Sequence, residues 1–152
     1  MDKFIIRGGN TLNGTVPISG AKNASLALMP ATILAEGKCL LQNTPRLRDI
    51  TTMSILLEQM GVEVRHPGTT LELDTASVSK FEAPYELVKK MRTSFYVLGP
   101  LLGKFGYAKV SYPGGCAWGP RPVNLHLMAM EKLGAEIAIE QGYVLAKADR
   151  LK

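Results

Sequence analysis

The chain has 152 residues, of which 46% are hydrophobic and 20% are charged, a composition typical of a folded globular protein rather than a disordered or fibrous one. Its net charge of +5 favours an anionic ligand, but the lysines and arginines are scattered, so we expect no nucleic-acid partner. The longest apolar runs fall well short of the roughly 20 residues that a membrane span needs, and no secretory leader is visible. We therefore expect a cytoplasmic protein without a membrane partner.

Two short strands, at 3–7 and 15–19, are the first predicted elements, and a turn joins them. No third strand follows nearby in the sequence that could complete a sheet with them. We therefore expect residues 1–20 to join another lobe of a larger protein.

The next predicted unit, residues 21–83, begins with a long apolar helix. Apolar spacing at Met53, Leu56 and Met60 predicts a second helix, and alternating or β-branched runs predict the strands. The predicted order is helix 21–35, strand 38–43, helix 50–60, strand 62–66 and strand 70–75.

A second unit, residues 84–148, repeats this order. The segment from Leu57 to Val64 matches the segment from Met130 to Ile137 at an offset of 73 residues, and each contains a glycine expected to end a helix, Gly61 and Gly134. Upstream of these segments the offset is 69, so the second unit carries four extra residues. Its predicted elements are helix 85–104, strand 107–112, helix 122–133, strand 135–140 and strand 143–147.

The repeat predicts an α/β fold built from helix-strand-helix-strand-strand units. The helices at 21–35 and 85–104 are apolar on most faces, which favours burial within a larger assembly. We expect residues 149–152 to begin a third, truncated unit. The fold would then be incomplete in this chain.

The four extra residues fall in the loop 113–121, which contains Cys116 between glycines and prolines. Insertions of this kind usually carry function, yet a free cysteine is often only a small apolar side chain. Arg121, Pro122 and the amides of residues 123–125 open the next helix, where unpaired N–H groups favour a phosphate. Two alternatives stay open at this point. Arg121 is either a phosphate ligand or an ordinary solvated residue, and Cys116 is either a reactive thiol or a structural residue.

Polar residues also occupy corresponding positions toward the starts of the apolar helices of both units. Lys22 and Asn23 open the helix at 21–35, and Arg92 takes the place of Asn23 at an offset of 69. If the units are related by a rotation, these residues and Arg121 meet in one pocket that suits a multiply charged ligand. The alternative is that these are ordinary polar residues of a first helical turn, which would produce the same sequence pattern. His66 and His126 have no neighbouring ligand cluster, so we expect no metal.

Three motifs together resemble the UDP-N-acetylglucosamine 1-carboxyvinyltransferase family, the enolpyruvyl transferases of peptidoglycan synthesis. They are Gly20-Ala21-Lys22-Asn23-Ala24-Ser25, Met91-Arg92-Thr93-Ser94 and the longer Gly114-Gly115-Cys116-Ala117-Trp118-Gly119-Pro120-Arg121-Pro122-Val123-Asn124-Leu125-His126. The shikimate-pathway enolpyruvyl transferases are similar in fold but lack this cysteine loop.

The resemblance implies two lobes of repeated units of the inside-out α/β barrel type, of which this chain covers about a third. It implies the substrates phosphoenolpyruvate and UDP-N-acetylglucosamine, with no cofactor and no metal. Cys116 would be the catalytic proton donor and the target of fosfomycin-type epoxides. The implied phosphoenolpyruvate ligands are Lys22, Asn23 and Arg121, and the implied sugar-nucleotide ligands are Arg92, Arg121, Pro122, Val123, Asn124 and Leu125.

Two positions depart from the family pattern. Asn124 replaces a usual Asp, and Trp118 replaces a usual aliphatic residue. The resemblance also places a second, acidic catalytic group and further arginines in a missing C-terminal lobe, so we expect negligible turnover from residues 1–152 alone. The alternative interpretation is a non-catalytic domain that binds a nucleotide sugar or another anion.

Overall fold

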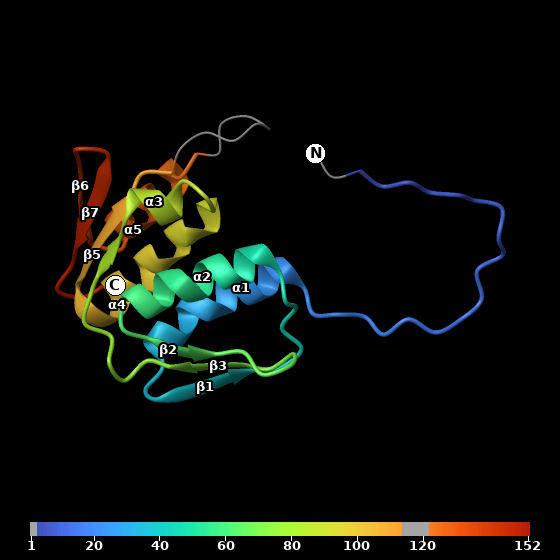
Figure 1. The fold of residues 1–152 in the computed structure, drawn as a ribbon. Coiled ribbons are helices and arrows are strands. Elements are labelled where there is room, and N and C mark those ends of the chain that lie inside the picture. Colours follow the sequence, from blue (N-terminus) through green and yellow to red (C-terminus); the bar gives the residue numbers. More distant parts are fainter. Residues whose placement is uncertain (1–2, 114–121) are drawn as a thin grey trace.

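The computed structural model describes residues 3–113 and 122–152 (Figure 1). Its first half contains two helices and a small sheet, because apolar residues recur at helical spacing in two segments, and short strand-forming runs lie between and after these segments. The elements are α1 (Lys22–Ala31), the 3-10 helix η1 (Thr32–Leu34), β1 (Lys38–Leu41), α2 (Arg48–Gln59), β2 (Glu63–Arg65) and β3 (Leu71–Asp74).

The second half repeats this order with a short strand and a broken helix in front. Its elements are β4 (Glu82–Ala83), α3 (Tyr85–Val88), the 3-10 helix η2 (Arg92–Val97), α4 (Leu98–Phe105), β5 (Tyr107–Ser111), α5 (Asn124–Lys132), β6 (Glu136–Glu140) and β7 (Tyr143–Lys147). None of the described helices is long and apolar enough to cross a bilayer.

The two sheets have the same core topology. The first has the order β1-β3-β2 and the second the order β4-β5-β7-β6. In the first sheet Lys38 pairs with Asp74, and in the second Tyr107 pairs with Lys147. Lys38 and Tyr107 are 69 positions apart, and Asp74 and Lys147 are 73 positions apart. These are the two offsets of the sequence repeat. Among the strands of residues 3–113 and 122–152, β4 and β5 are the one parallel pair.

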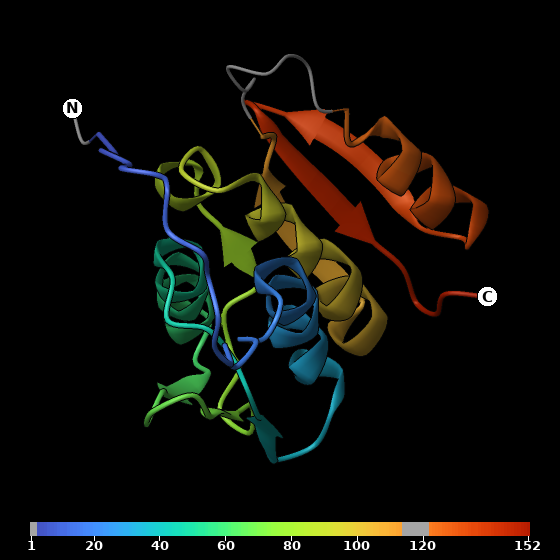
Figure 2. The same cartoon turned by 90° about the vertical axis from the view of Figure 1, so that its right-hand side faces the viewer.

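The core lies between the sheets, where Figures 1 and 2 both place α1 and α4. The inward faces of the helices carry side chains with at most 1% exposure, among them Met29, Leu57 and Leu101. In β3, Leu71 and Leu73 are buried on one face because successive strand residues point to opposite sides. Burial of this apolar surface is the main favourable contribution to folding.

The predicted strands at 3–7 and 15–19 do not form. Residues 3–20 contain no helix or strand, and their apolar side chains are exposed, with Phe4 at 98% and Ile18 at 85%. A strand is stable only when another strand satisfies its backbone groups, and no strand in 3–113 or 122–152 pairs with this segment. In Figure 1 it extends away from the helices.

The predicted helix at 85–104 is wrong as a single element. Met91 has an extended backbone (φ −149°, ψ 107°) and separates α3 from η2, while its side chain is only 6% exposed. Apolar composition predicted the length of the segment but not this break. The sequence also gave no indication of β4, because a two-residue strand has no periodicity.

The glycine stops are confirmed at both predicted positions. Gly61 follows α2 with φ +101°, and Gly134 follows α5 with φ +94°. A Cβ atom on Gly61 would lie 2.3 Å from the carbonyl oxygen of Ser77. Glycine is therefore required there both for its backbone angle and for space.

Candidate functional site

Lys22 is the first residue of α1, and its side chain reaches the start of α2. Its Nζ atom lies 2.6 Å from Oδ2 of Asp49, in the first turn of α2. The two side chains are 43% and 37% exposed, so the ammonium group is accessible to solvent. Asn23 follows at the next position and is exposed. Two of the three predicted phosphoenolpyruvate ligands, Lys22 and Asn23, therefore lie at an accessible helix start.

The chain enters α1 through a tight contact with the loop after β1. The Gly20 amide donates a 3.1 Å hydrogen bond to Oδ1 of Asn43. A Cβ atom on Gly20 would lie 1.7 Å from the Asn43 carbonyl oxygen. The glycine of the first motif thus allows this close approach and fixes the direction in which α1 begins.

Arg92 and the start of α5 meet directly. The Nη2 atom of Arg92 donates a 3.2 Å hydrogen bond to the carbonyl oxygen of Pro122. Val123 is buried, whereas Asn124 and Leu125 are exposed at the start of α5. The structure therefore brings together the described members of the predicted sugar-nucleotide set.

One detail of this predicted helix start is wrong. Pro122 precedes the first helical residue, Asn124, by two positions and does not lie in the first turn of α5. Val123 takes the N-cap position of α5, and its buried side chain fixes the chain at the start of this helix. Cys116 and Arg121 lie outside the described residues, as does the rest of the 114–121 loop.

The residues around Arg92 carry an unsatisfied hydrogen-bonding demand. Nε of Arg92, Oγ1 of Thr93 and Oγ of Ser94 are buried without a hydrogen-bond partner among the described residues. A buried polar atom left unpaired costs about 1–3 kcal/mol. Water or a polar ligand would therefore stabilise this segment.

A cavity of about 240 Å³ lies between α1, η2, α4 and α5. No sequence pattern predicted it, because it depends on how these helices pack. His126 lines it, with its ring centroid 6.2 Å from that of Phe95 and 6.3 Å from that of Tyr96. These aromatic contacts link η2 to the first turn of α5. The hydrogen bond from Arg92 to Pro122 joins the same two helices, η2 and α5.

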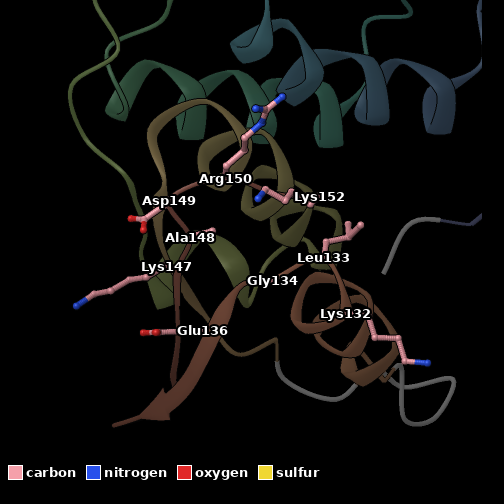
Figure 3. A pocket seen from close by; sticks show the side chains of 9 residues that line it. All are labelled: Lys132, Leu133, Gly134, Glu136, Lys147, Ala148, Asp149, Arg150 and Lys152. Atoms are coloured by element: carbon pink, nitrogen blue, oxygen red, sulfur yellow. The ribbon is translucent and has the colours of Figure 1, made fainter.

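A larger cavity, about 560 Å³, lies elsewhere, at the turn between α5 and β6 (Figure 3). Its charged residues are Lys132, Glu136, Lys147, Asp149, Arg150 and Lys152. Figure 3 shows that the side chains of Lys132, Lys147 and Arg150 point in different directions, so they do not converge on one anion. We regard it as a surface hollow and not as the substrate site, despite its size.

No metal centre is formed by the described side chains, since no group of three or more potential ligands occurs among them. Lys22 and Arg92 each have their own partner, and no hydrogen bond or ion pair joins them to each other within residues 3–113 and 122–152. The described site therefore consists of two separate helix junctions. The predicted ligand cation is Lys22 at the first junction and Arg92 at the second, and Arg48 also lies at the start of α2.

Comparison with known proteins assigns the family. Residues 6–151 match the model of the family described as EPSP synthase (3-phosphoshikimate 1-carboxyvinyltransferase). The chain belongs to the EPSP synthase family.

Within the EPSP synthase family, curated relatives named UDP-N-acetylglucosamine 1-carboxyvinyltransferase are similar over nearly the whole chain. The one from Chloroherpeton thalassium is 56% identical over 151 residues, covering 99% of this chain and 35% of the relative. The one from Halorhodospira halophila is 54% identical over 153 residues, covering 100% of this chain and 37% of that relative. The resemblance found in the sequence is confirmed, and the chain spans about a third of the length of these relatives.

Solved structures confirm the α/β fold class. The enolpyruvyl transferase NikO from Streptomyces tendae superposes with a TM-score of 0.79 at 25% identity, covering 95% of this chain and 32% of NikO. The EPSP synthase of Acinetobacter baumannii gives a TM-score of 0.62 at 17% identity, covering 91% of this chain and 33% of that enzyme. The latter likeness concerns the fold alone.

Proposed function

We propose that the protein carrying this chain transfers the enolpyruvyl group of phosphoenolpyruvate to the 3-hydroxyl of UDP-N-acetylglucosamine, with release of phosphate. The observation that carries this proposal is the 56% identity to a relative of that name over 99% of the chain. The Cys116 loop, which belongs to this family and not to the shikimate-pathway enzymes, also supports it. The reaction would be the first committed step of peptidoglycan synthesis, in the cytoplasm.

In the proposed reaction Cys116 donates its thiol proton to the methylene carbon of phosphoenolpyruvate. The 3-hydroxyl oxygen of the sugar then adds to the neighbouring carbon and gives up its proton to a base. Loss of phosphate, and of one proton from the new methyl group, yields the enol ether. A thiol with an ordinary pKa of about 8.5 can exchange a proton near neutral pH.

The proposed binding roles follow the charge of the substrates. Phosphoenolpyruvate carries a carboxylate and a phosphate, and preorganised cations stabilise such charge most effectively. Lys22, Asn23 and Arg121 would hold this substrate. Lys22 donates one hydrogen bond to Asp49, so an ammonium group with three N–H donors keeps two for a ligand.

The sugar nucleotide would lie at the second helix junction. Arg92 and the segment from Arg121 to Leu125 would contact its diphosphate and sugar. The amides at the start of α5 can donate to a phosphate oxygen. Leu125 is 63% exposed and offers an apolar surface to a ring.

The activity would need both lobes of the complete protein, since the chain spans about a third of its relatives. The base and further arginines would come from the other lobe. We propose no metal and no cofactor for this reaction. The cysteine would make the complete protein a target of fosfomycin-type epoxides.

Phosphate release by the complete gene product tests the proposal. We expect release only when phosphoenolpyruvate and UDP-N-acetylglucosamine are both present. Cys116→Ala should lower the rate by about 10²- to 10⁴-fold, the range typical of a lost general acid. Cys39→Ala is the matched control, because Cys39 is a half-buried residue of β1, and it should keep the parental rate.

Two results would contradict the proposal. Binding of UDP-N-acetylglucosamine without any phosphate release would favour the non-catalytic domain. Full activity in Cys116→Ala would remove the role of the thiol.

A further inference from the structure

The ion pair between Lys22 and Asp49 joins the starts of two helices. Its 2.6 Å distance spans residues 27 positions apart in the sequence. Figure 1 shows α1 and α2 side by side, beginning at the same end. A carboxylate in the first turn of α2 is also stabilised by the positive end of that helix. Asp49 is thus a fixed acceptor for a long, flexible side chain.

The second unit has an equivalent connection made by different chemistry. Asp49 corresponds to Pro122 at the offset of 73, and Asn23, next to Lys22, corresponds to Arg92 at the offset of 69. Arg92 donates to the backbone carbonyl of Pro122, whereas Lys22 donates to the side chain of Asp49. In both units a cation at the start of one helix, α1 or η2, is therefore held near the start of the helix that follows the next strand, α2 or α5.

We infer that Asp49 is a positioning residue for Lys22, an inference that rests on the proposed function. The lysine side chain has four rotatable bonds, and their freedom is lost when the ammonium group binds a ligand. Asp49 restricts this freedom before phosphoenolpyruvate arrives. It leaves two N–H donors of Lys22 directed elsewhere.

An opposing effect has to be weighed. The negative charge of Asp49 also repels an anionic substrate and competes with it for Lys22. Both partners are more than a third exposed, so water and salt screen this repulsion strongly. We therefore expect positioning to exceed repulsion.

Two substitutions separate the effects. Asp49→Ala removes both the acceptor and the charge, whereas Asp49→Asn keeps an acceptor oxygen and removes the charge. In the complete protein, Asp49→Ala should raise the KM for phosphoenolpyruvate about two- to fivefold, the range expected for an exposed ion pair, with little change in kcat. Asp49→Asn should restore the KM toward the parental value.

A second measurement reports on the ion pair without turnover. Acetylation of Lys22 by an N-hydroxysuccinimide ester, followed by mass spectrometry, should be faster in Asp49→Ala than in the parent. Glu86→Ala is the matched control, because Lys89 also pairs at 2.6 Å and has a similar exposure of 39%. Its hydrogen bond with Glu86 raises the pKa of Lys89. This control should accelerate acetylation of Lys89 and leave the KM unchanged.

The outcomes are distinct. A lower KM in both Asp49 variants would show that competition dominates and would overturn the inference, as would an unchanged KM in Asp49→Ala. Equal impairment of the Ala and Asn variants would also overturn it. A parent protein without turnover would instead remove the proposed function, while the acetylation rates would still report whether Asp49 holds Lys22.

Discussion

Individual residues fix the helix ends that carry the candidate site. Gly20 passes so close to Asn43 that any side chain would meet its carbonyl oxygen, and Asp49 holds the ammonium group of Lys22. The sequence predicted Lys22 and Arg92 as site residues from their helix starts and motifs. It could not predict their partners, because those lie 27 and 30 residues away and depend on how the helices pack.

Gly61 offers a direct test at this scale. Gly61→Ala should lower the free energy of unfolding by about 3 kcal/mol or more, because a Cβ atom would meet the Ser77 carbonyl oxygen at 2.3 Å in a left-handed backbone. Gly68→Ala is the control, since Gly68 also has a positive φ, of +58°, but no atom within 4 Å of the added Cβ. It should cost only about 1 kcal/mol. Equal losses in chemical denaturation would contradict the steric explanation.

At the scale of elements, length and periodicity decided which predictions succeeded. α2 and the strands β5 to β7 were predicted because apolar residues follow one period over several turns or pairs. The break at Met91 and the strand β4 were missed because each depends on packing over only two or three residues. The strands predicted in 3–20 have suitable patterns, but a pattern alone does not supply the pairing partner that a strand requires.

The inward face of α2 should carry most of that helix's contribution to stability. Leu57→Ala should lower the free energy of unfolding by about 2–5 kcal/mol, because Leu57 is fully buried and its truncation leaves a cavity. Ile55→Ala, in the same helix, should cost less than about 1 kcal/mol, because Ile55 is 42% exposed. Thermal or denaturant unfolding of the two variants checks this, and a greater loss from Ile55→Ala would be inconsistent with the described packing.

For the whole molecule, the internal repeat was visible in the sequence, and the strand registers of the two sheets follow its offsets. The repeat predicted that cations of both units meet in one pocket, but it did not predict the contacts that each cation makes. The described residues form two cationic helix junctions, and the proposed site residues Cys116 and Arg121 precede Pro122 of the second junction in the sequence. The identity of the acceptor rests on the similarity of the chain to its curated relatives.

Acceptor choice by the complete gene product tests the central proposal most directly. With phosphoenolpyruvate present, kcat/KM for UDP-N-acetylglucosamine should exceed that for 3-phosphoshikimate by at least about 10⁴-fold, because a site built to hydrogen-bond one substrate leaves buried polar groups unpaired with another. The enolpyruvyl ether of UDP-N-acetylglucosamine should be the product. Turnover of 3-phosphoshikimate at an equal or higher kcat/KM would contradict the account.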